Sequence, residues 1–76
     1  MALKRNLHPI PNYIISALEA ENLMERYRRR PPYQQNDYIG WITRAKRQET
    51  IDKRLGQMLD ELRNGNKYMG MEYSGK

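Results

Sequence analysis

The segment 48–64 constrains the fold most strongly, because its apolar residues recur at helical spacing. A period of three to four residues places apolar side chains on one face of an α-helix. Glu49 and Asp52 stand in the first turn, where the helix dipole is positive, and Gly65 follows where a C-terminal stop is expected. We therefore predict a long helix over residues 48–64. Its apolar stripe comprises Ile51, Leu55, Met58, Leu59 and Leu62, and its outward positions include Gln57, Asp60 and Glu61.

Proline residues mark a helix start and a helix end in the first half of the chain, and they predict two shorter helices. Pro11 suits a first helical turn, where a missing N–H costs nothing, so a helix should run from about residue 12 to residue 20. Asn22 is a plausible N-cap for a short second helix that reaches Arg29. Pro31 should end that helix, because proline disfavours helical geometry in the residue before it.

A third helix is predicted over residues 38–45, with Pro32 as its earliest start. Tyr38, Trp41 and Ile42 follow the spacing i, i+3, i+4 on one face. Residues 1–10 form a basic arm that ends in "HPIP". Residues 66–76 alternate only weakly between apolar and polar, so we predict an extended tail folded over the helices without a partner strand.

Together these segments predict one all-α domain over residues 1–76: a small bundle of four helices with a long fourth helix and an extended C-terminal tail. A chain of 76 residues buries only about 60% of its unfolded surface, so its few large apolar side chains should be structural. Truncating a buried Trp41 to alanine would cost about 3–5 kcal/mol. The predicted core comprises Ile14, Leu18, Leu23, Tyr27, Tyr38, Trp41, Ile42, Ile51, Leu55, Met58, Leu59 and Leu62.

The composition argues against catalysis and against bound cofactors. Cysteine is absent, which removes disulfides, thiol chemistry and cysteine metal sites. His8 is the only histidine, and alone it gives neither a metal ligand set nor an oriented catalytic pair. We therefore expect no catalytic residue, no metal and no cofactor. No segment approaches the 18 or so apolar residues of a membrane span, and we expect a soluble cytoplasmic protein.

Positive charge gathers in the middle of the chain. The net charge is +5, and residues 26–54 carry nine basic side chains against three acidic ones. If the ends of the second and third helices meet, six cations would form one basic corner that grips carboxylate or phosphate through arginine forks. The alternative is that these charges only complement helix dipoles at the surface. The six residues are Arg28, Arg29, Arg30, Arg44, Lys46 and Arg47.

The short basic join between the third and fourth helices also suggests a helix-turn-helix for DNA. A recognition helix contacts bases mainly through its N-terminal residues. Here that turn carries Glu49 and Asp52, which would face phosphates unfavourably, and only Gln57 resembles a base reader. Packing is therefore the favoured interpretation of this join. Tyr33, after the double proline, is left open as an exposed aromatic contact for a partner.

The run "RPPYQQNDYIGWITRAKRQETIDKRLGQMLDELRNGNKYMGM" resembles the YdeI/OmpD-associated (bacteriocin-protection) family. The resemblance is carried by "PPYQ", by the Tyr38, Trp41 and Ile42 core, by "AKRQET" and by "KRLGQMLDEL". It implies an all-helical module, which many members carry after a β-rich domain that this chain is expected to lack. It implies a stress or bacteriocin-tolerance role, and it transfers no catalytic residue.

Two functions remain after these exclusions. The first is a non-enzymatic interaction module whose basic corner docks an acidic protein. The second is a nucleic-acid-binding protein that uses the same cations on phosphates. The sequence indicates neither the identity of the partner nor an oligomeric state.

Overall fold

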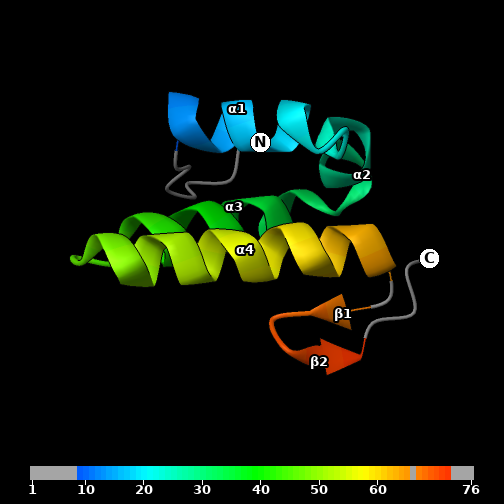
Figure 1. Cartoon of the computed structure of the whole chain (residues 1–76). Helices are drawn as coiled ribbons and strands as arrows, with labels where there is room; N and C mark the ends of the chain where they lie inside the picture. Colours follow the sequence, from blue (N-terminus) through cyan, green and yellow to red (C-terminus); the bar gives the residue numbers. More distant parts are fainter. Residues whose placement is uncertain (1–8, 66, 73–76) are drawn as a thin grey trace, which may run out of the picture.

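The computed structural model describes residues 9–65 and 67–72 and shows four helices followed by a short hairpin (Figure 1). The predicted all-α class with a long fourth helix is confirmed. Among the described residues, no helix combines the length and apolar character that crossing a membrane requires. The elements are α1 (Asn12–Ala20), α2 (Met24–Arg29), α3 (Pro32–Thr43), α4 (Gln48–Asn64), β1 (Lys67–Tyr68) and β2 (Met71–Glu72).

The longest two helices, α3 and α4, lie side by side and form the base of the bundle (Figure 1). The shorter helices α1 and α2 lie over one side of this pair, and the hairpin lies at the C-terminal end of α4 (Figure 1). The loop between α3 and α4 is therefore at the opposite end of the molecule from the hairpin. This separation decides which charged groups can act together.

The boundaries of the helices follow local backbone chemistry. Pro32 is the first residue of α3, where proline fits, and Gly65 ends α4 in a left-handed conformation with φ of 86°. The predicted N-cap at Asn22 is wrong. Asn22 has φ of 62° and ends α1, because its N–H bonds to the carbonyl of Glu19 and the next N–H bonds to Leu18. These two bonds form the turn that commonly closes a helix C-terminus.

The core lies between the α3–α4 pair and the two short helices. It contains most of the predicted residues and also Ile39, which the spacing argument missed because α3 buries an arc wider than one stripe. Four predicted core residues are only half-buried and pack at its edge: Trp41, Ile51, Leu55 and Leu59. The buried apolar residues are Ile14, Leu18, Leu23, Tyr27, Tyr38, Ile39, Ile42, Met58 and Leu62.

Residues 67–72 of the predicted tail pack against α4, but the prediction that the tail has no partner strand is wrong. β1 and β2 pair antiparallel, with Lys67 opposite Glu72 and Tyr68 opposite Met71. The two turn residues, Met69 and Gly70, have φ of 52° and 80°. A two-residue hairpin whose turn residues both have positive φ matches the right-handed twist of its strands.

Candidate functional site

The six cations of the predicted basic corner do not lie together. Arg28, Arg29 and Arg30 precede α3, whereas Arg44, Lys46 and Arg47 follow it. Twelve helical residues span about 18 Å, which exceeds the screening length of about 10 Å at 0.1 M salt. The end of α2 meets the beginning of α3 and not its end. The single corner is therefore divided into two separate groups.

Arg30 is not an exposed binding residue, because its side chain is only 6% exposed. Its guanidinium donates to the Gln34 side chain at 3.1 Å, and to the backbone carbonyls of Glu61 at 3.1 Å and Lys67 at 2.8 Å. It thus ties the start of α3 to the end of α4 and to β1. Its role in the structure is to hold the hairpin end of the bundle together.

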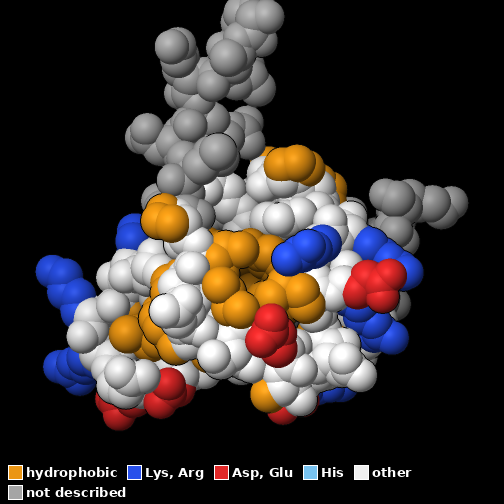
Figure 2. Space-filling model, turned by 90° about the horizontal axis from the view of Figure 1, so that it is seen from above, with side chains coloured by type: hydrophobic (Ala, Val, Ile, Leu, Met, Phe, Trp, Pro, Cys, Tyr) orange, Lys and Arg blue, Asp and Glu red, His pale blue; other side chains and the backbone are white. Residues whose placement is uncertain are grey.

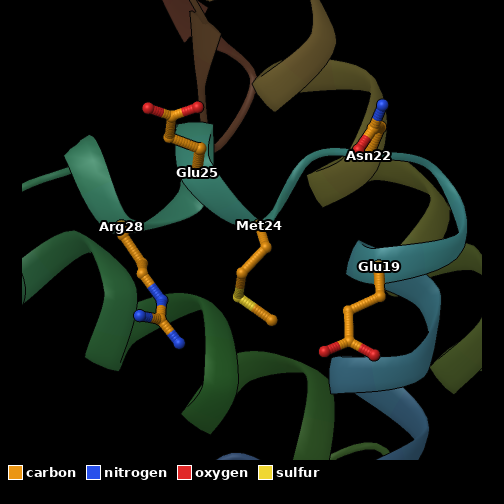
Figure 3. Close-up of a pocket in the computed structure, with 5 residues that line it drawn as sticks. All are labelled: Glu19, Asn22, Met24, Glu25 and Arg28. Carbon is orange, nitrogen blue, oxygen red and sulfur yellow. The ribbon is translucent and has the colours of Figure 1, made fainter.

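Arg28 and Arg29 are exposed but lie among acidic residues. Arg29 pairs with Glu25 at 3.4 Å across one helical turn. Arg28 lines an open hollow of about 460 Å³ together with Glu19, Asn22, Met24 and Glu25. Figure 3 shows Glu19, Met24 and Arg28 reaching into this hollow from α1 and α2. The two arginines are thus balanced by two glutamates.

The face formed by α1 and α2 carries charges of both signs. Figure 2 shows apolar side chains gathered around a depression on this face, with basic and acidic side chains at its margin. A surface of this kind has little net field with which to attract a strongly charged partner.

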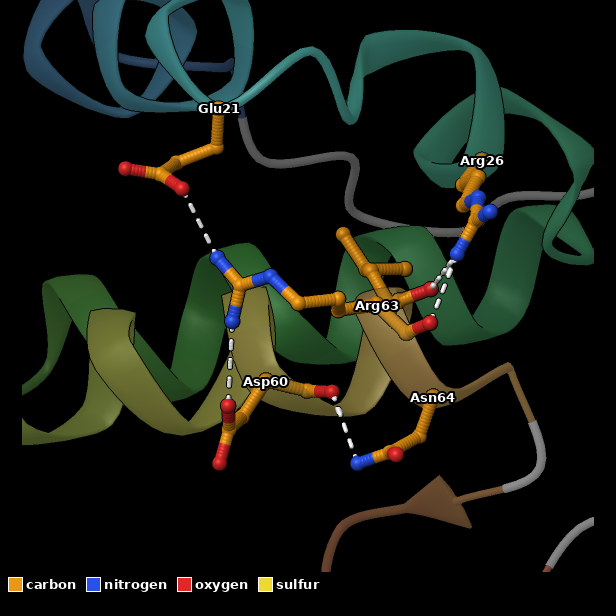
Figure 4. A network of polar contacts seen from close by, with 6 residues as sticks. Glu21, Arg26, Asp60, Arg63 and Asn64 are labelled. Carbon is orange, nitrogen blue, oxygen red and sulfur yellow. Dashed lines mark hydrogen bonds and ion pairs between the residues drawn. The ribbon is translucent and has the colours of Figure 1, made fainter.

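Two further arginines brace the bundle at the end of α4. Arg63 donates to Glu21 at 2.8 Å and to Asp60 at 3.1 Å, which links α4 to the turn after α1 (Figure 4). Arg26 donates to the backbone carbonyl of Arg63 at 2.6 Å (Figure 4). The Asn64 side chain donates to the backbone carbonyl of Asp60 at 3.1 Å. These polar groups are engaged within the molecule.

The loop between α3 and α4 holds the other half of the predicted cations. Arg44, Lys46 and Arg47 are all exposed, and we call these three residues the basic loop. The ion pair observed here joins Arg47 to Glu49 at 4.0 Å, and both side chains are 81% exposed. Pairs of this kind contribute little, because water screens them. Among the described residues, neither Arg44 nor Lys46 forms an ion pair.

A second hollow, of about 330 Å³, lies between α3 and the hairpin, and it adjoins the basic loop at Arg44. We call it the Trp41 hollow. The Tyr68 hydroxyl donates to the Asp37 carboxylate within it at 2.7 Å, and burial of Tyr68 with this carboxylate beside it raises the pKa of that hydroxyl. Its lining residues are Asn36, Asp37, Gly40, Trp41, Arg44, Tyr68 and Met69.

Tyr33 is 46% exposed, as an aromatic contact residue would be. Its hydroxyl accepts a hydrogen bond from the Gln34 side chain at 3.1 Å, and its ring meets the Tyr68 ring edge-on at 6.2 Å between centroids. The ring therefore supports the hairpin on one side. A contact between its exposed side and a partner stays a prediction.

Comparison with known families adds to this geometry. The sequence profile of the family described as bacteriocin-protection, YdeI or OmpD-associated (OmdA) matches residues 8–65. The chain belongs to this family. The match spans α1 to α4 and the basic loop, and it ends at Gly65, so the hairpin lies beyond it. No curated protein and no solved structure shows significant similarity to the chain.

A buried carboxylate joins the helical part that matches the OmdA family to the hairpin beyond it. Glu61 is 5% exposed, so the expectation that it points outward from α4 is wrong. One carboxylate oxygen accepts from the Tyr38 hydroxyl and from the Met69 N–H at 2.8 Å. The other accepts from the Gly70 N–H at 2.7 Å and the Gln57 side chain at 3.0 Å.

The four hydrogen-bond donors determine the direction in which the pKa of the Glu61 carboxyl shifts. Burial alone would raise the pKa of Glu61, but the hydrogen bonds from Tyr38, Gly70, Gln57 and Met69 together lower it. Burial and the neighbouring Glu61 carboxylate raise the pKa of Tyr38 above its ordinary value of 10.0. The ionised carboxylate and the neutral phenol thus stabilise each other. No sequence motif indicated this cluster.

The acidic side chains of the described residues are not arranged as a metal site. Within residues 9–65 and 67–72, no three His, Cys, Asp or Glu side chains are placed to hold a metal ion. His8 lies outside the described residues, as does most of the predicted basic arm.

Proposed function

We propose that this OmdA-family protein is a non-enzymatic interaction module that docks an acidic segment of a partner protein onto the basic loop. The observation that carries the proposal is the exposure of three cations within four residues at one tip of the bundle. Arg44 and Lys46 make no ion pair among the described residues, and Arg47 has one weak pair. The family description, bacteriocin protection, supports a role in tolerance of a bacteriocin or of a related stress.

The other arginines give further support, because many of them are already engaged. Arg26, Arg30 and Arg54 each donate to backbone carbonyls, and Arg63 bridges two carboxylates. A cation that already satisfies a carbonyl loses that bond if it turns to a partner. The basic loop therefore combines three exposed cations that have at most one weak ion pair among the described residues, and their field can speed association with an acidic partner.

An acidic protein segment suits this tip better than a nucleic acid does. Glu49 follows the basic loop directly, and its side chain is 81% exposed. Asp52 is also exposed in the next turn. A duplex presents a phosphate every few ångströms and would bring some of them against these carboxylates. A peptide can place its carboxylates at the three cations alone.

A matched pair of charge reversals tests the proposal. One variant carries Arg44→Glu, Lys46→Glu and Arg47→Glu. The control carries Arg28→Glu, Arg29→Glu and Lys67→Glu, which are exposed positions outside the basic loop. Each triple change lowers the net charge by six, from +5 to −1. The two variants therefore differ in the position of the charge and not in its amount.

Fluorescence anisotropy with a labelled glutamate-rich peptide and a labelled DNA duplex gives the readout. Exposed ion pairs contribute about 0.2–1 kcal/mol each, so reversal of the basic loop should weaken peptide binding by about 3- to 150-fold. The control should weaken it much less. Equal losses in both variants would show a response to net charge alone and contradict the proposal. Tighter binding of the duplex, with a steep linear dependence of log K on log salt, would favour the nucleic-acid alternative.

A further inference from the structure

The Trp41 hollow runs along one stripe of α3. Four α3 residues and Arg44, which follows α3 in helical conformation, have the spacing i, i+1, i+4, i+5 and i+8, so they share one helix face. This stripe is about 12 Å long, and Tyr68 and Met69 of the hairpin form the facing wall. The stripe consists of Asn36, Asp37, Gly40, Trp41 and Arg44.

The indole in this hollow is fixed in place from the α4 side. The guanidinium of Arg54 lies 5.3 Å from the centre of the Trp41 ring and donates to the Trp41 backbone carbonyl at 2.6 Å. A cation over one ring face stabilises that arrangement. Trp41 is half-buried and is one of the residues that line the hollow. The hollow thus has a rigid aromatic wall, which is typical of sites that receive an apolar side chain.

Of the two charged residues that line the hollow, one has a hydrogen-bond partner in the hairpin and the other forms no ion pair among the described residues. Asp37 accepts a hydrogen bond from the Tyr68 hydroxyl at 2.7 Å, so its carboxylate is engaged with the hairpin. Arg44, at the other end of the stripe, pairs with no carboxylate among the residues the structure describes. Arg44 also belongs to the basic loop. The apolar wall and the exposed cations therefore form one continuous surface.

We propose that the Trp41 hollow receives a bulky apolar side chain of the acidic segment that docks on the basic loop. This inference rests on the proposed function and names the chemistry of its partner: a short acidic segment with one aromatic or large aliphatic anchor. Carboxylates that flank the anchor pair with Arg44, Lys46 and Arg47. Charge steers the segment to this end of the protein, and burial of the anchor slows its release.

The charge pattern selects this occupant over a basic one. A segment rich in lysine would meet Arg44 at the mouth of the hollow and Lys46 and Arg47 beside it. A wholly apolar segment would leave these cations without partners. A segment that combines acid with one apolar anchor satisfies both parts of the surface.

Trp41 provides a direct reporter, because it is the only tryptophan in the chain. Two acidic peptides are titrated into the full chain at low salt. They are identical except that one has a central phenylalanine and the other a central glycine. The phenylalanine peptide should bind about tenfold more tightly or better, and it alone should shift the emission of Trp41.

The variant Trp41→Leu removes the aromatic wall, and anisotropy follows its binding. It should bind the glycine peptide as the wild type does and lose most of the preference for phenylalanine. Circular dichroism checks that it folds, and the wild-type titrations decide the matter if it does not. Equal affinities of the wild type for both peptides, or unchanged Trp41 emission on saturation, would overturn the inference and leave the proposed function standing. Failure of the glycine peptide to bind at low salt would instead remove the proposed function.

Discussion

Replacing Glu61 by glutamine should destabilise the protein strongly, although it changes one atom of a side chain. The carboxylate accepts two hydrogen bonds on each oxygen, from Tyr38 and Met69 on one and from Gly70 and Gln57 on the other. An amide keeps one acceptor oxygen. Its NH₂ group then faces one side-chain group and one backbone N–H in a site that is 5% exposed. The Tyr38 hydroxyl or the Gln57 amide can turn to accept from the NH₂ group, but the backbone N–H of Met69 or Gly70 is left facing a donor.

The magnitude can be worked out from these four bonds. A hydrogen bond to a charged group contributes about 1.5–3 kcal/mol, and a buried group left without a partner costs about 1–3 kcal/mol. Water near the hairpin turn can replace part of the loss at Gly70. We therefore expect Glu61→Gln to lower the free energy of unfolding by about 2–4 kcal/mol. A domain of this size has about 4–11 kcal/mol in total, so the loss is a large fraction.

Urea denaturation followed by far-ultraviolet circular dichroism measures this loss. Glu49→Gln is the matched control, since it makes the same chemical change in α4 at a side chain that is 81% exposed. The control should stay within about 0.5 kcal/mol of the wild type. Equal unfolding free energies for Glu61→Gln and the wild type at neutral pH would refute the account of the cluster.

The pH dependence gives an independent check on Glu61. Its pKa in the folded protein is below the ordinary value of 4.5, so the folded state favours the ionised form. The stabilisation is therefore fully present above about pH 4.5 and is lost as the pH falls through the lower folded pKa. The stability difference between wild type and Glu61→Gln should shrink over this acidic range. A difference that stays constant would show that the carboxylate charge is not its source.

Three further predictions concern stability and use the same denaturation assay. Tyr38→Phe should cost about 1–2 kcal/mol. It should also remove part of the loss of stability at alkaline pH. The pKa of Tyr38 is raised above 10.0 in the folded protein, so the stabilisation is fully present below pH 10.0 and is lost as the pH rises through the folded pKa. Trp41→Ala should cost less than Leu62→Ala, at about 2 against 3–4 kcal/mol, since Trp41 is half-buried and Leu62 is 1% exposed; the reverse order would contradict this placement. Gly65→Ala should cost about 1 kcal/mol because of its φ of 86°, and an unchanged midpoint would argue against that conformation.

The sequence predicts the helices well because the signals that define them are local. The apolar stripe of residues 48–64 and the following Gly65 lie within one segment, and α4 has the predicted bounds. The spacing on α3 identified Tyr38 and Ile42 but not Ile39. The width of a buried arc depends on how many neighbours a helix has, and this number is a property of the whole bundle.

The hairpin and the Glu61 cluster could not be predicted in the same way. The sequence signal for a two-residue turn with positive φ is normally Asn-Gly or Asp-Gly, whereas here the residues are Met69 and Gly70. Successive backbone N–H groups in such a turn form a concavity that suits an anion. The carboxylate of Glu61 occupies it from α4. The turn is therefore specified by a contact between elements.

The distribution of arginines shows why a charge count overstates the binding surface. The last four carbonyls of a helix have no partner within the helix. At the end of α4, Arg26 donates to the carbonyls of Leu62 and Arg63. Arg30 adds a second hydrogen bond to the Glu61 carbonyl, which also accepts from the Gly65 N–H. Two of the cations in the run from Arg26 to Arg30 are thus used to close a helix.

The same logic applies at the other end of the bundle, with a different result. The Trp41 carbonyl, near the end of α3, accepts from Arg54, which reaches across from α4. Because Arg54 supplies that bond, the residues of the basic loop are not needed for it. Arg44 and Lys46 make no side-chain hydrogen bond among the described residues. An arginine that donates to a carbonyl at a helix end is less available to a partner. The cations that make no such bond, Arg44 and Lys46, lie in the basic loop beside the Trp41 hollow.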